Sequence, residues 1–115
     1  MATAQAQDIS TKYTGAQQDL ESLVIARQKL ETQLQENKIV QDEFDTLKDD
    51  TQVYKLTGSV LLPVDQDEAK NNVSKRLEFI STEISRCEEN IKNKQTELET
   101  LRSQLVQLQS SMQQS

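Results

Sequence analysis

The sequence of this 115-residue chain predicts a mostly α-helical fold, in which two long helices pair antiparallel as a coiled coil and are joined by a single β-hairpin. Two observations predict this fold. In the second half of the chain, apolar residues recur at alternating steps of four and three over more than five heptads, which is the pattern of a coiled-coil seam. Between the two heptad-patterned segments, two short apolar runs flank a Gly-Ser pair, which is typical of a β-hairpin.

The second helix is expected over residues 66–112. Asp65 is suited to the N-cap position, and Glu68 three residues later completes a capping-box arrangement. The last residues, 113–115, are expected to fray. The seam of this helix consists of Val73, Leu77, Ile80, Ile84, Cys87, Ile91, Lys94, Leu98, Leu101, Leu105, Leu108 and Met112.

The first helix is expected over residues 8–48, after a frayed segment 1–7. Polar residues interrupt its seam. Such residues can fix the register of a coiled coil, although they lower its stability. Two apolar residues, Ile39 and Val40, lie off the stripe, so either the seam shifts there or these residues cover a second surface. The seam positions are Ile9, Tyr13, Ala16, Leu20, Leu23, Arg27, Leu30, Leu34, Asn37, Gln41 and Phe44.

The hairpin is expected over residues 52–64. Gly58-Ser59 predicts a type II′ turn, which places Thr57 opposite Val60 and Lys55 opposite Leu62. The chain reverses direction at this turn, and the two helices have similar lengths. We therefore expect the helices to pair antiparallel within one chain, rather than in parallel between two chains.

Both faces of the predicted hairpin carry apolar side chains. An isolated two-stranded hairpin is at best marginally stable in water, and an exposed apolar one with open edges is a template for aggregation. Joining strands of other chains in a shared sheet or barrel would solve this problem. The sequence therefore predicts an obligate oligomer that assembles through residues 53–64.

Composition excludes several function classes. The net charge is −6 and no basic run exists, which argues against nucleic acid or an anionic membrane as partner. No apolar stretch approaches the roughly 20 residues of a membrane span. There is no histidine, and two glycines cannot form a phosphate-binding loop. We therefore expect no enzymatic activity, no catalytic residue, no metal and no cofactor.

The cysteine content and the first residues bear on the compartment. The one cysteine, Cys87, lies on the predicted seam, where it is expected to be an inert small apolar residue. A single cysteine cannot form an internal disulfide, and residues 1–7 show no secretory pattern. We therefore expect a cytoplasmic protein.

Three segments resemble the β-type subunits of prefoldin, a co-chaperone. Residues 24–40 (VIARQKLETQLQENKIV) resemble the first arm of such a subunit, and residues 53–64 (VYKLTGSVLLPV) resemble its hairpin. Residues 75–80 (KRLEFI) resemble the start of the second arm. A single hairpin is the mark of the β-type, because the α-type subunit carries two.

The resemblance implies a hetero-hexamer with other prefoldin subunits, whose β-hairpins form an intersubunit double β-barrel with six projecting arms. It implies capture of unfolded polypeptides, actin and tubulin among them, and their delivery to the cytosolic chaperonin without nucleotide hydrolysis. The assembly residues would be Val53, Tyr54, Leu56, Val60, Leu62 and Val64. The client-binding residues, at the tips of the arms, would be Ile9, Tyr13, Leu105, Leu108 and Met112.

Two alternatives remain open from the residues. The apolar tip residues could equally close the last turns of the coiled coil without touching a client. The whole chain could also be a structural or tethering coiled coil without client binding, although such a protein would not need the apolar hairpin.

Overall fold

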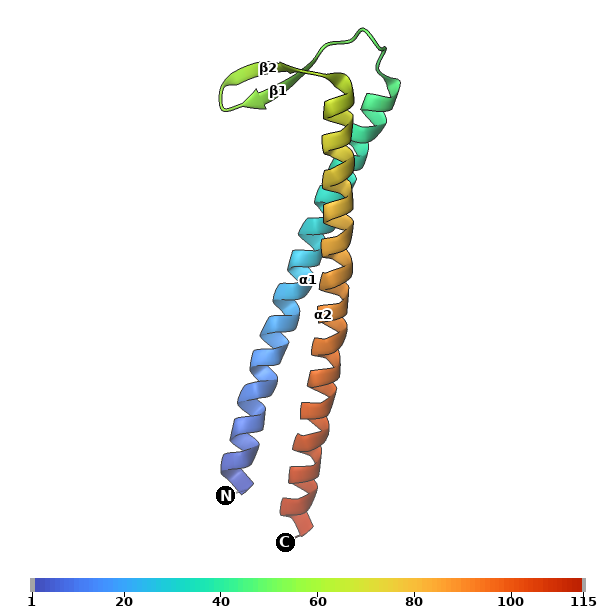
Figure 1. Ribbon diagram of the computed structural model, residues 1–115. Helices are drawn as coiled ribbons and strands as arrows, with labels where there is room; N and C mark the ends of the chain where they lie inside the picture. Colours follow the sequence, from blue (N-terminus) through green and yellow to red (C-terminus); the bar gives the residue numbers. More distant parts are fainter. Residues whose placement is uncertain (1, 115) are drawn as a thin grey trace. The chain divides into compact units, whose positions relative to one another are not determined.

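The computed structural model describes residues 2–114 and confirms the predicted fold class (Figure 1). Helix α1 spans Ala2–Thr46 and helix α2 spans Gln66–Gln114. Between them, strands β1 (Val53–Thr57) and β2 (Val60–Val64) form a two-stranded antiparallel sheet.

Both helices are longer than the sequence pattern indicated. Helix α1 begins at Ala2 rather than near Asp8, because alanine and glutamine are favourable helix residues and no breaker precedes Gly15. It ends at Thr46, two residues before the expected end, where Leu47 N donates to Phe44 O in a tight turn. Helix α2 continues to Gln114. Met1 and Ser115, which were also expected to fray, lie outside the described residues.

The start of α2 differs in detail from the expected capping box. Ala69 N donates to Asp65 O over 2.9 Å, as expected when Asp65 is the residue before the helix. The structure records this backbone bond, but no side-chain capping bond at Asp65 or Glu68 within the described residues. Asp65 directly follows Val64, the last residue of β2, so strand pairing already sets the direction in which the chain enters the helix.

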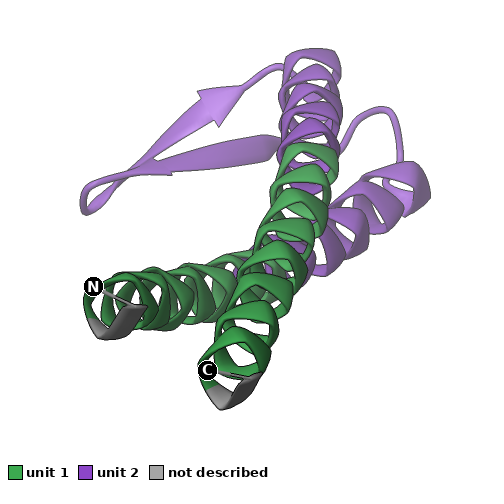
Figure 2. Ribbon diagram, turned by 90° about the horizontal axis from the view of Figure 1, so that it is seen from below, with its two compact units in different colours: residues 1–28, 85–115 green, residues 29–84 purple. Residues whose placement is uncertain are grey.

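The chain divides into two compact units, shown in different colours in Figure 2. Unit 1 contains residues 1–28 and 85–115, and unit 2 contains residues 29–84. In unit 1 the two helix segments run antiparallel. Arg27 contacts Glu88, whereas Ile9, nearer the start of α1, lies beside Leu108, nearer the end of α2.

The buried residues lie along the seam that the heptad pattern predicted. Every predicted seam position of α2 is buried or half-buried except Met112, which is 47% exposed. Every predicted seam position of α1 is likewise buried or half-buried. Among the described residues, the buried apolar ones are Ala16, Cys87 and Leu101 in unit 1, and Val73, Ile80 and Ile84 in unit 2.

Candidate functional site

The hairpin turn has the geometry that the Gly-Ser pair predicted. Gly58 has a φ of 62°, and no non-glycine residue among those described has a positive φ. A type I′ turn requires positive φ at both central residues, so the negative φ of Ser59 fits a type II′ turn instead. The strands pair in the predicted register, with Thr57 opposite Val60 and Lys55 opposite Leu62.

The hairpin exposes most of its apolar side chains. Leu56 and Leu62 are 67% and 48% exposed, and they belong to opposite faces of the two-stranded sheet. Of the predicted assembly residues, only Val53 and Val64, at the base, are half-buried. The exposed large apolar residues of the hairpin are Tyr54, Leu56, Val60, Leu61 and Leu62. A concentration of this kind on one short element is typical of a protein–protein contact surface.

Two glutamines fix the base of the hairpin, and the sequence pattern did not reveal them. Gln52 donates its side-chain amide to Val53 O and Val64 O, over 2.9 and 3.3 Å, and so ties the two strands together. Gln66 donates to Lys48 O and Thr51 O, over 3.0 and 3.3 Å, and so holds the loop between α1 and β1. A glutamine next to a strand carries no special signal, because its role depends on carbonyl groups brought close only by the fold.

The predicted tip residues lie at the end of unit 1 that holds the first turns of α1 and the last turns of α2. Ile9, Tyr13, Leu105 and Leu108 are half-buried in the seam, so this structure packs them against the partner helix. Met112 is exposed, and so is Val106, which lies off the seam. A pocket of about 470 Å³ opens here between Ile9 and Leu108, with Gln5, Asp8, Gln104, Gln107 and Ser111 around it.

Off the seam, the structure exposes further apolar residues. Ile39 and Val40 are 59% and 39% exposed, while Asn37 and Gln41 stay half-buried in the seam. The seam therefore does not shift at Asn37, and Val40 contributes to a second surface. Val24, Ile25 and Phe79 are also exposed, and the heptad pattern alone did not single them out.

No group of three or more histidine, cysteine, aspartate or glutamate side chains is placed to hold a metal ion within the described range. Across residues 2–114, neither helix has a segment that is both long and apolar enough to cross a membrane.

Comparison with known proteins gives consistent matches. The family model of the prefoldin subunit (Prefoldin_2) matches residues 7–112. The chain is 64% identical to prefoldin subunit 6 of Saccharomyces cerevisiae over 101 residues, which covers 88% of this chain and 89% of the yeast protein. It is 41% identical to human prefoldin subunit 6 over 102 residues, covering 89% of this chain and 79% of the human protein.

A solved structure extends the likeness to three dimensions. The crystal structure of the prefoldin beta subunit from Thermococcus strain KS-1 superimposes with a TM-score of 0.81 at 28% identity, covering 93% of this chain and 91% of that one. The beta2 subunit from the same strain has the same fold, with a TM-score of 0.67 at 21% identity over 79% of this chain and 97% of that one. Two long helices joined by one hairpin, together with these similarities, show that the chain belongs to the prefoldin family, as a beta-type subunit similar to prefoldin subunit 6.

Proposed function

We propose that this prefoldin chaperone subunit works within a hexamer that captures unfolded polypeptides, such as actin and tubulin, and delivers them to the cytosolic chaperonin. It acts in the cytoplasm, without enzymatic activity, nucleotide hydrolysis or a cofactor, and neither nucleic acid nor a membrane is a partner. One observation carries the proposal. The hairpin between the two long helices exposes apolar side chains on both of its faces.

Assembly follows from the energetics of that hairpin. Burying apolar surface contributes roughly 25 cal/mol per Å², so covering several leucine and valine side chains supplies a large driving force for association. The strand edges offer unpaired backbone groups that strands of other subunits can pair with. The proposed assembly residues are those singled out from the sequence: Val53, Tyr54, Leu56, Val60, Leu62 and Val64.

Co-expression with the other prefoldin subunits, followed by native mass spectrometry, tests assembly. The wild-type chain should enter a six-chain particle. Leu62→Asp should be excluded from it, because taking a carboxylate and Lys55 opposite it out of water costs more than their attraction returns. Val106→Asp is the matched control, since it also places a carboxylate on an exposed apolar position but lies outside the hairpin. Normal incorporation of Leu62→Asp would contradict the proposal.

Client capture is proposed for the end of unit 1 where the predicted tip residues lie. Weak apolar contacts from several arms would together hold an unfolded chain, although no single arm binds tightly. Met112 and Val106 offer exposed apolar surface there, and Ile9, Tyr13, Leu105 and Leu108 would add theirs when the last turns of the seam separate.

Removing residues 1–12 and 104–115 tests the client surface. The truncated chain should still assemble, but the particle should no longer suppress aggregation of unfolded actin. The alternative is a structural coiled coil without a client. It is favoured by the half-buried positions of four of the five tip residues in the seam, which are Ile9, Tyr13, Leu105 and Leu108. Unchanged suppression by the truncated particle would reject the tip as the client surface. A wild-type particle that never suppresses aggregation would favour the structural role.

A further inference from the structure

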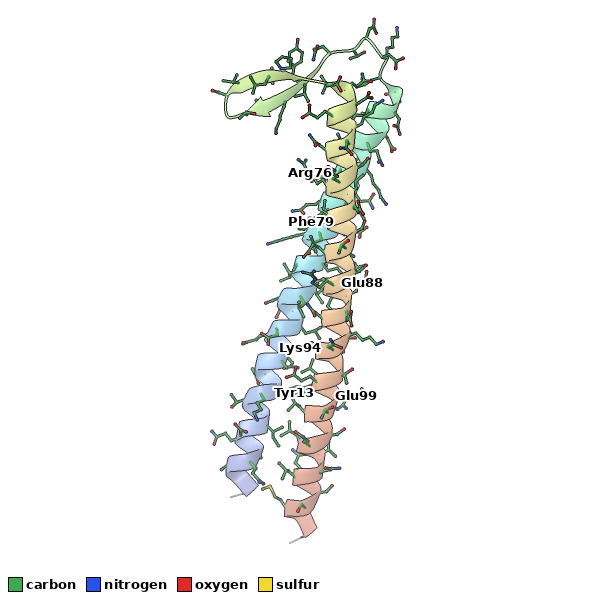
Figure 3. All side chains as sticks on the ribbon, in the orientation of Figure 1. Tyr13, Arg76, Phe79, Glu88, Lys94 and Glu99 are labelled. Atoms are coloured by element: carbon green, nitrogen blue, oxygen red, sulfur yellow. The ribbon has the colours of Figure 1, made fainter. Side chains whose placement is uncertain are left out.

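Unit 2 contains a pocket of about 450 Å³ in the corner between the hairpin and the two helices. Val40 and Phe44 of α1, Val53 and Val64 of the hairpin, and Lys55 and Arg76 contribute to its lining. We call it the corner pocket. Figure 3 labels Arg76 on α2, a little below the hairpin.

The corner pocket explains why Val40 is apolar although it lies off the seam. The next residue, Gln41, is the seam position and is half-buried although it is polar. Val40 lies outside the seam, at a position where a typical coiled coil carries a polar residue. Val40 is not covered by its own helix pair and faces the corner pocket instead. An apolar lining that its own chain leaves open fits an apolar side chain from another molecule.

The charges at the pocket specify the chemistry of that molecule. Lys55 and Arg76 are the charged residues that line it, and both are positive. The structure records no ion pair for either residue within the described range. The chain is acidic overall, yet two cations and no carboxylate line this partly apolar pocket, which makes the pocket complementary to an apolar residue with an adjacent aspartate or glutamate.

The position of the pocket indicates the kind of partner. Val53 and Val64 line the pocket, and they lie on the same hairpin face as Val60 and Leu62, which are proposed assembly residues. A chain that covers this face of the hairpin would therefore reach the corner pocket without a gap. This continuity favours a neighbouring subunit over an unfolded client.

We propose that the corner pocket receives an apolar side chain of a neighbouring, non-identical prefoldin subunit, and that a carboxylate next to that side chain pairs with Arg76 and Lys55. The inference rests on the proposed assembly through the hairpin. It adds a second, charge-selective contact, which would help to decide which subunit stands beside this one.

A photo-crosslinking amino acid at position 40, in the particle assembled from all the subunits, tests the proposal. Irradiation should link Val40→benzoylphenylalanine to a peptide of another subunit that holds an apolar residue beside an aspartate or glutamate. The matched control is the same substitution at Ile39, which is more exposed than Val40 but does not line the pocket. A crosslink from position 40 to a second copy of this chain or to a client, or no crosslink beyond that of the Ile39 control, would overturn the proposal.

Charge reversal provides a second test. Lys55→Glu combined with Arg76→Glu should weaken association with the neighbouring subunit about tenfold, measured as subunit exchange by native mass spectrometry. Lys75→Glu is the control, because it reverses one charge beside Arg76 but outside the pocket lining, and it should change exchange less than about twofold. An unchanged exchange rate in the double variant would overturn the proposal.

Assembly through the hairpin and the contact at the corner pocket can be rejected separately. Normal assembly of Leu62→Asp would reject the hairpin as the assembly surface, and the corner pocket with it. A blocked Leu62→Asp together with an unaffected charge-reversal variant would reject only the corner pocket.

Discussion

Lys94 of α2, which Figure 3 labels, reaches across the seam to Asp19 of α1, with 3.5 Å between Nζ and Oδ2. Its Nζ also lies 2.8 Å from Glu97 Oε2 on its own helix. The hydrogen bond to Glu97 is the main cause that raises the pKa of Lys94 above its ordinary value of 10.5, against the opposing effect of burial. The charge of Glu97, and then the hydrogen bond to Asp19 and the charge of Asp19, raise it further. A charged residue can therefore occupy a seam position that the heptad pattern would assign to an apolar one.

The raised pKa of Lys94 predicts a loss of stability at alkaline pH. The folded state holds the proton more tightly than the unfolded state, so the contribution of Lys94 is fully present below pH 10.5 and disappears as the pH rises through the higher folded-state pKa. The melting temperature of the assembled particle, followed by circular dichroism between pH 9 and about 12, should fall more steeply for wild type than for Lys94→Met. Parallel curves for the two proteins would contradict the assignment, because the two chains differ only at position 94.

Arg27 provides a second test of polar seam positions. Its Nη2 lies 2.8 Å from Glu88 Oε1, but the two side chains keep 39% and 52% of their surface exposed, and pairs so open to solvent contribute about 0–1 kcal/mol. Arg27→Leu should therefore stabilise the coiled coil by about 1 kcal/mol, because the gain from burying leucine in the seam exceeds the loss of the ion pair. Glu88→Gln is the control and should change stability by less than about 0.5 kcal/mol. Urea unfolding of the assembled particle measures both, and destabilisation by Arg27→Leu would refute the argument.

The parts of the fold that local periodicity determines were predictable from the sequence. A seam follows from the spacing of apolar residues alone, so Lys94 and Arg27 were placed on it although they are charged. The pairing of Thr57 with Val60 was predictable for the same kind of reason, since a two-residue turn fixes the register of a hairpin.

Contacts between elements were not predictable in this way. The side-chain amides of Gln52 and Gln66 donate to carbonyl groups that are distant from them in sequence, such as Val64 O and Lys48 O. No rule of residue spacing predicts such bonds. Val40 could be identified as lying off the seam, but the corner pocket that it lines required the position of the hairpin. At the tip, the sequence left open whether apolar residues face the partner helix or a client, because the same heptad positions serve both roles.

Gly58 is predicted to be essential for the hairpin. Its φ of 62° lies in the left-handed region, where a side chain costs about 1–2 kcal/mol. No atom lies within 4 Å of the place where a Cβ would be, so the penalty of Gly58→Ala arises from the backbone rather than from a clash. We expect lower yields of assembled particle from Gly58→Ala and near-normal yields from Ser59→Ala, whose φ is not positive. Equal yields from the two variants would show that the turn does not limit assembly.

Gly15 should respond in the opposite direction. It lies in the interior of α1, its φ is not positive, and a Cβ would meet no atom within 4 Å. Alanine is favoured over glycine by about 1 kcal/mol in a helix interior, since glycine loses more conformational freedom on folding. Gly15→Ala should therefore raise the urea midpoint of the particle and slow hydrogen exchange of the amides around residue 15. A lower midpoint would contradict this prediction. It would mean that a contact of the folded arm, absent from the isolated chain, requires glycine at position 15, and comparing the particle with and without client would show where that contact is made.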